Sequence, residues 1–100
     1  MTSISFVASS GMQAAQVRMG ASAHNIANTQ TEDFHREEVV QQARPDSGGT
    51  EATVRRAPEA GNQLEQDVVD QLAAKNSFLA NLAVFKAGDK MLGTLIDSQA

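Results

Sequence analysis

The stretch 63-QLEQDVVDQLAAKNSFLANLAVFKAGDKMLGTLID-97 decides the fold, because it reads as one long helix. At 1.5 Å per residue a helix of this length spans about 50 Å. Carboxylates gather near its start and lysines lie towards its end, and both placements complement the helix dipole. The carboxylates are Glu65, Asp67 and Asp70, and the lysines are Lys86 and Lys90.

Apolar side chains recur along this segment at helical spacing. Leu64, Val68, Leu72, Leu79 and Leu82 share one face, which Phe78, Phe85, Leu92 and Ile96 continue with a slight drift. We interpret this face as the one that packs against a second helix. Other apolar residues, such as Val69 and Leu95, point elsewhere and indicate contacts beyond one neighbour.

A second helix is predicted over residues 4–28. Its seam residues alternate at spacings of four and three, the period of a coiled coil; they are Ala8, Met12, Ala15, Met19, Ser22 and Ile26. Asn25 and Asn28 mark its end, since asparagine tolerates the left-handed conformation that terminates helices. We expect the two helices to close an antiparallel coiled-coil-like hairpin, in which Met12, Met19 and Ile26 face Leu72, Leu79 and Leu82.

The segment between the helices predicts a short irregular β-hairpin over about residues 34–57. Residues 34–42 and 50–56 read as strands, and the turn cluster 45-PDSGG-49 separates them. An isolated two-stranded hairpin is marginal in water, so it needs another element to rest on. The expected fold is mainly α, a single domain over 1–100, divided into an N-terminal helix segment (1–31), a hairpin excursion (32–62) and a C-terminal helix (63–100).

Composition excludes several classes of function. The 100 residues carry a net charge of −4 and no cysteine, which removes disulfides, cysteine zinc sites and thiol catalysis. The acidic balance disfavours electrostatic capture of nucleic acid. No stretch approaches the roughly 18 apolar residues of a membrane helix. We therefore expect neither nucleic-acid binding nor direct membrane insertion, and no cleavable signal peptide.

The apolar residues are mostly small, because alanine is abundant and the only aromatics are four phenylalanines. Small side chains suit close helix–helix approach better than a bulky core. A monomer built in this way is expected to be marginally stable.

Reactive side chains are few. His24 reads as a surface or capping residue near a helix end. His35, with Glu37 and Glu38, leaves a divalent-metal site as a minor alternative, although this spacing does not match known ligand sets. We find neither a nucleophile elbow nor a phosphate-binding loop. We therefore expect no enzyme activity, no catalytic residue, no cofactor and no resident metal.

Two motifs lie at the two ends of the chain. The N-terminal motif is 8-ASSGMQA-14 with 25-NIANTQTEDF-34, and the C-terminal motif is 78-FLAN-81 with 89-DKML-92. These motifs resemble the terminal helices of bacterial flagellar rod and hook proteins, and most closely those of the short proximal rod proteins. Asp33 stands where members of that family usually have a glycine.

This resemblance implies an axial subunit of the basal-body rod, which is exported by the flagellar type III apparatus and polymerises helically in the periplasmic rod through its terminal helices. The implied partners are the chain itself, other axial rod and hook proteins, and the export apparatus. A non-polymerising helical-hairpin adaptor, or an export-associated protein with the same ends, is the alternative. The residues implied in packing and assembly are Met12, Met19, Asn25, Ile26, Asn28, Thr31, Phe34, Leu72, Phe78, Asn81, Leu82, Phe85, Asp89 and Leu92.

Overall fold

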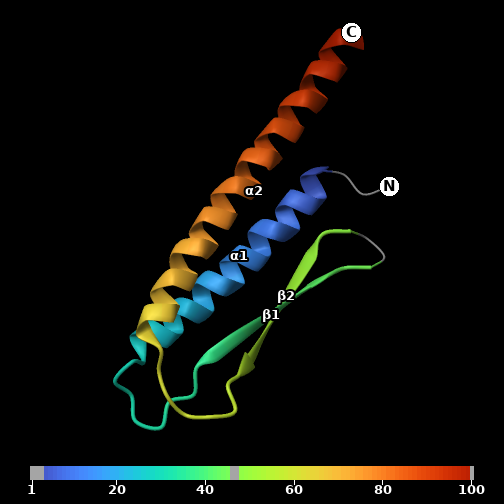
Figure 1. The fold of residues 1–100 in the computed structure, drawn as a ribbon. Helices are drawn as coiled ribbons and strands as arrows, with labels where there is room; N and C mark the ends of the chain where they lie inside the picture. Colours follow the sequence, from blue (N-terminus) through green and yellow to red (C-terminus); the bar gives the residue numbers. More distant parts are fainter. Residues whose placement is uncertain (1–3, 46–47, 100) are drawn as a thin grey trace.

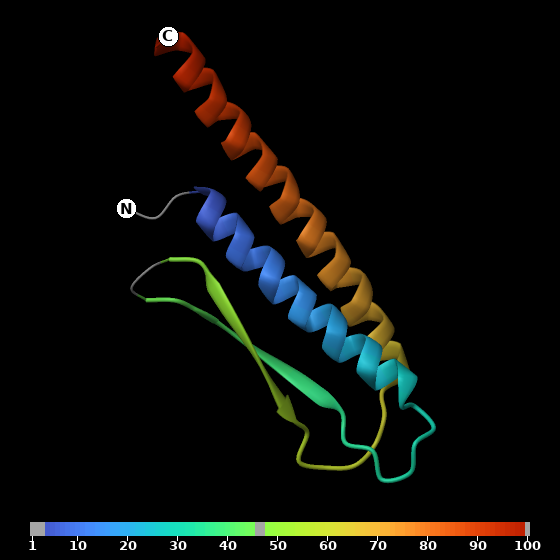
Figure 2. The same ribbon diagram turned by 180° about the vertical axis from the view of Figure 1, so that it is seen from behind.

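The fold is a pair of antiparallel helices with a β-hairpin inserted between them in sequence (Figure 1). The computed structural model describes residues 4–45 and 48–99. Its elements are α1 (Ile4–Ala27), β1 (Glu37–Ala43), β2 (Thr50–Arg56) and α2 (Leu64–Gln99). The hairpin lies against α1 on the side away from α2, as both views show (Figure 2). The predicted mainly α architecture, with its packed helices and intervening hairpin, is confirmed.

Helix α1 buries small residues because it is contacted from two sides. Its buried residues are Ala8, Ser10, Ala14, Ala15, Ala21, Ser22 and Asn25. Three members of the predicted seam, Ala8, Ala15 and Ser22, are among them, whereas Met12, Met19 and Ile26 are half-buried. The seam therefore has small residues along its centre and larger ones along its flank.

The face of α2 that packs against α1 differs from the expected leucine face. Buried and half-buried positions recur at spacings of four and three, and they are Asp67, Gln71, Ala74, Phe78, Asn81, Phe85 and Gly88. The expected burial of Leu72 and Leu79 opposite the methionines is wrong, because these side chains are 57% and 49% exposed. Two contacts on the α1-facing side determine how α2 is rotated about its own axis. Asp67 accepts a hydrogen bond from Arg36, and Asn81 packs against Gly11 of α1.

Gly11 is the point of closest approach between the helices. A Cβ atom placed there would lie 2.5 Å from Oδ1 of Asn81, whose Nδ2 donates to the carbonyl oxygen of Ser77 at 2.8 Å. At Gly20 of the same helix, the corresponding position has no atom of the described chain within 4 Å apart from its two neighbours and the nearby backbone of α1. Close packing at Gly11 therefore requires glycine, and the fold of this chain does not require it at Gly20.

We expect Gly11→Ala to lower the free energy of unfolding by about 1 kcal/mol, because overpacking outweighs the gain of roughly 1 kcal/mol in helix propensity. Gly20→Ala is the matched control and should raise the free energy of unfolding by up to about 1 kcal/mol. Urea unfolding at one low protein concentration measures both. Equal stabilisation by the two alanines would show that the helices do not approach closely at Gly11.

The hairpin is regular and is attached to α1 near its tip. Seven consecutive residue pairs, from Glu37 with Arg56 to Ala43 with Thr50, form one antiparallel register without a bulge. The backbone N–H of Thr50 donates to Oγ of Ser10 at 3.0 Å, and this hydroxyl donates to the carbonyl oxygen of Val7 at 2.7 Å. One buried serine thus joins α1 to the start of β2.

Ser10→Ala should leave the backbone N–H of Thr50 without its acceptor, at a cost of about 1–3 kcal/mol. We expect amide hydrogen exchange at Thr50 to accelerate by about tenfold or more, since 1.4 kcal/mol corresponds to a factor of ten. Ser9→Ala, at the neighbouring half-buried serine, is the control. Unchanged protection of Thr50 in the Ser10 variant would show that strand pairing alone holds the tip.

The molecule is long, thin and poor in buried apolar volume. The buried apolar residues of its described part are all alanines: Ala8, Ala14, Ala15, Ala21 and Ala74. Its surface is 6969 Å², against about 5,500 Å² for a typical folded monomer of this mass. Its radius of gyration is 17.3 Å, against about 13 Å for a compact chain of this length. Neither of the two helices, as far as they are described, has an apolar stretch long enough to cross a membrane.

Helix α2 continues well beyond the start of α1 (Figure 1). The first residues of α1, Ile4 and Ser5, lie beside Gly88. Residues 89–99 therefore form a projecting end about 16 Å long, which carries Met91, Leu92, Leu95 and Ile96 with 58–63% of each side chain exposed.

Candidate functional site

The three segments of the fold meet at a cluster of polar residues that we call the polar junction: Asn25, Arg36, Glu37 and Asp67. The Asn25 amide pairs with the backbone of Glu37, accepting from its N–H at 2.7 Å and donating to its carbonyl oxygen at 3.0 Å. The same Nδ2 donates to Oδ1 of Asp67 at 3.2 Å. Asn25 therefore extends the backbone pairing of β1 onto α1 and links both to α2.

Arg36 completes the polar junction from the loop that precedes β1. Its Nε donates to Oδ2 of Asp67 at 3.2 Å, and its Nη2 donates to Oδ1. The Asp67 side chain is 2% exposed and that of Arg36 is 15% exposed. This arrangement is a bidentate guanidinium–carboxylate pair, the geometry in which arginine binds carboxylates most strongly.

The hydrogen bond to Asp67 raises the pKa of Arg36 above its ordinary value, despite the opposing effect of burial. A cation whose pKa is raised by folding stabilises the fold fully below its unfolded-state pKa and loses that contribution only as pH rises through the raised value. Since the pKa of Arg36 is raised further above an already high ordinary value, Arg36 stays charged over the pH range in which proteins are studied.

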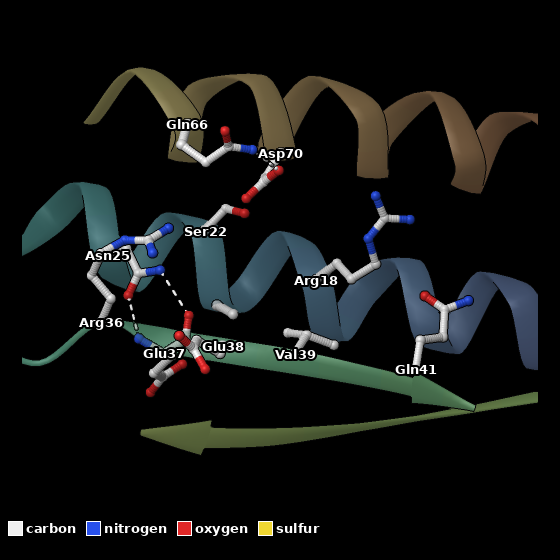
Figure 3. Close-up of a pocket in the computed structure, with 11 residues that line it drawn as sticks. Arg18, Ser22, Asn25, Arg36, Glu37, Glu38, Val39, Gln41, Gln66 and Asp70 are labelled. Carbon is white, nitrogen blue, oxygen red and sulfur yellow. Dashed lines mark hydrogen bonds between the residues drawn. The ribbon is translucent and has the colours of Figure 1, made fainter. Parts of the chain in front are cut away.

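A polar groove of about 310 Å³ opens beside the polar junction (Figure 3). Arg18 of α1, Glu38 of β1, and Gln66 and Asp70 of α2 contribute to its walls, so side chains of both charge signs face the same space. Gln66 donates to Asp70 at 2.9 Å. All three segments of the fold, namely α1, α2 and the segment of β1, therefore contribute side chains to this groove.

The motif residues at the end of α1 hold the chain reversal. Asn28 donates to the carbonyl oxygen of His24 at 2.8 Å and accepts from the Thr31 hydroxyl at 3.0 Å. The Phe34 ring lies 5.4 Å from the His24 ring. Asp33 has a φ of 55°, in the left-handed region that glycine adopts freely and aspartate tolerates better than most residues. The turn therefore accommodates Asp33 in a conformation that glycine adopts most readily.

The structure brings some of the predicted packing residues together and leaves others apart. Phe78, Asn81 and Phe85 are half-buried on the α1-facing side of α2, and Leu82 is half-buried at the boundary between this side and the exposed side. Leu72, Asp89 and Leu92 are exposed, so within this chain they do not belong to the helix seam.

The residues of the minor metal alternative are engaged elsewhere. Nδ1 of His35 lies 2.8 Å from the carbonyl oxygen of Ala57. Glu38 accepts from Arg55 at 2.9 Å, and Glu37 lies 3.6 Å from His24. Within residues 4–45 and 48–99, no three histidine, aspartate or glutamate side chains converge on a point where a metal ion could bind.

The sequence interpretation missed Asp67 and Arg36. It interpreted Asp67 only as a charge that complements the helix dipole. Asp67 lies seven residues, or about two helical turns, before the buried Ala74, and therefore on the same face of α2, which packs against α1. A carboxylate at a core-facing position requires a cation, which was the available signal. Nothing local marks Arg36 as its partner, since 31 residues separate the two.

The exposed side of α2 carries a second seam, which we call the outer face: Val68, Leu72, Lys75, Leu79, Leu82 and Lys86. Its positions also alternate at spacings of four and three. Val68, Leu72 and Leu79 are 44%, 57% and 49% exposed. Chemically, the polar junction holds segments of the chain in register, and the outer face offers an apolar surface suited to another helix.

No protein-family model and no curated protein matches this sequence.

Proposed function

We propose that this chain is a structural subunit of the bacterial flagellar basal-body rod, an axial protein that polymerises helically through its terminal helices. It reaches the periplasmic rod by flagellar type III export, and its partners are its own copies and other rod and hook proteins. In this proposal the chain is not an enzyme and its function is mechanical.

One observation carries the self-assembly part of the proposal: the small buried core beside a large exposed apolar surface. The buried apolar residues of the described chain are alanines, whereas ten large apolar side chains of α2 are exposed. Exposed apolar area on this scale marks interaction surfaces in soluble proteins. A subunit that completes its core with neighbours accounts for both features.

The contacts between the terminal motifs support the flagellar part. Gly11, from the N-terminal motif, meets Asn81, from the C-terminal motif. Asn25 and Asn28, the two asparagines of the 25-NIAN-28 sequence, hold the start of β1 and the end of α1. Four residues that carry the resemblance, Gly11, Asn25, Asn28 and Asn81, thus make contacts that shape this fold.

Purified basal bodies test the assignment directly. In the bacterium that encodes this chain, we expect mass spectrometry to find it in isolated hook–basal bodies, and we expect deletion of its gene to abolish flagella. Restoration by the wild-type gene controls for effects on neighbouring genes. A strain that lacks the chain yet assembles normal flagella would contradict the rod assignment and favour the adaptor alternative.

A further inference from the structure

The outer face of α2 has a counterpart of the same length on α1. On α1 the exposed residues Gln13, Gln16, Gly20, Ala23 and Ala27 alternate at spacings of three and four. They span about 21 Å of helix, as does the stretch of the outer face from Val68 to Leu82. Both sets therefore have the period that lets two helices pack along a continuous seam.

The two surfaces also differ in a complementary way. The outer face presents leucines and a valine that protrude, and its lysines can lay their aliphatic stems along apolar surface. The α1 surface presents a glycine, two alanines and two glutamines. Large side chains on one helix fit the spaces above small residues on another.

Gly20 supplies an independent reason to expect a neighbour on α1. A glycine in a helix interior destabilises it relative to alanine. Apart from its two neighbours and the backbone of α1 itself, no atom of the described chain lies within 4 Å of a Cβ placed at Gly20, and the residue has no positive φ. The fold of the single chain thus gives no reason for glycine here, whereas the close approach of a second helix does.

We propose that the outer face of α2 binds α1 of a second copy of this chain, along Gln13, Gln16, Gly20, Ala23 and Ala27. This inference rests on the proposed function and specifies its contact. The surface of the chain exceeds that of a typical monomer by about 1,500 Å². Two standard half-interfaces, each burying about 800 Å² per partner, account for that excess.

The contact is head-to-tail, because different surfaces of the two copies meet. A head-to-tail contact that does not close into a ring generates an open helical array. Every subunit within the array then uses α1 towards one neighbour and α2 towards the other. The polar junction lies at neither surface and stays intact in each copy.

Three variants test this contact by sedimentation velocity over a wide concentration range. Leu72→Glu/Leu79→Glu disables the outer face, and Gly20→Leu blocks the α1 surface. Val54→Glu, at an exposed apolar residue of β2 (49% exposed), is the matched control. Circular dichroism verifies folding, and a leucine at position 20 suits a helix better than glycine does. We expect the first two variants to associate at least about thirtyfold more weakly than wild type, and the control to associate normally.

Mixing the two disabled variants gives the decisive result. One retains a working α1 surface and the other a working outer face, so the equimolar mixture should form heterodimers and nothing larger. If Gly20→Leu associates as wild type does, the α1 surface takes no part in the contact and the inference is overturned, while self-assembly stands. If the wild type stays monomeric at every concentration, both this inference and the self-assembly part of the proposed function fail.

Discussion

Asp67→Ala is expected to lower the free energy of unfolding by about 3–5 kcal/mol, because it leaves the largely buried guanidinium of Arg36 without its counter-ion. The substitution also removes an acceptor from Nδ2 of Asn25. Since the buried apolar residues of the described chain are alanines and the strands pack against α1 and not against α2, little else links the hairpin segment to α2. Urea unfolding at a low, fixed protein concentration measures the change in the free energy of unfolding. The largest expected effect is that the variant does not fold.

The Glu38–Arg55 pair provides the control, since it has the same chemistry on the surface. Its Nε–Oε2 distance is 2.9 Å, and the arginine side chain is 67% exposed. Exposed pairs contribute about 0–1 kcal/mol, so Arg55→Ala should change stability by no more than that. Equal effects of Asp67→Ala and Arg55→Ala would show that the polar junction contributes no more than a surface pair.

Asn25→Asp should be nearly as damaging, although it exchanges one NH₂ group for an oxygen. The new oxygen would face two acceptors, the Glu37 carbonyl and the Asp67 carboxylate. In the wild-type structure these acceptors lie 3.0 and 3.2 Å from Nδ2 of Asn25. A buried like-charge contact and two lost hydrogen bonds together cost about 3–5 kcal/mol. The deficit relative to wild type should shrink at acidic pH, because a protonated carboxyl can donate again.

Asn28→Asp is the same chemical change three residues later, at an exposed amide that bonds to the His24 carbonyl. It removes one exposed hydrogen bond and places a negative charge at a helix C-terminus, which costs about 1 kcal/mol. A deficit at Asn25 no larger than that at Asn28 would indicate that solvent reaches the Asn25 site in solution.

The arrangement of helices and strands could be predicted from sequence because it depends on local signals. Helical spacing in residues 63–97, the asparagines at the end of α1 and the turn cluster at 45–49 each act over a few residues. Asn25 and Asn28 were expected to mark the end of α1, and their amides form hydrogen bonds there in the structure.

The rotation of α2 could not be predicted, because apolar residues occupy two adjacent seams of this helix. The leucine seam is the more apolar, yet α1 packs on the seam that contains Asp67, Ala74 and Asn81. The choice depends on Arg36 and Gly11, which are distant in sequence. A rule that buries the most apolar face fails in this helix, because an ion pair and a close glycine contact select the other face.

The concentration dependence of unfolding tests the central claim most directly, namely that neighbouring copies complete the core of this chain. If association stabilises the folded state, the urea midpoint must rise with protein concentration. We predict such a rise for the wild type and for Val54→Glu, and its loss in Leu72→Glu/Leu79→Glu. A wild-type midpoint that stays constant from low micromolar to near-millimolar concentration would contradict the account.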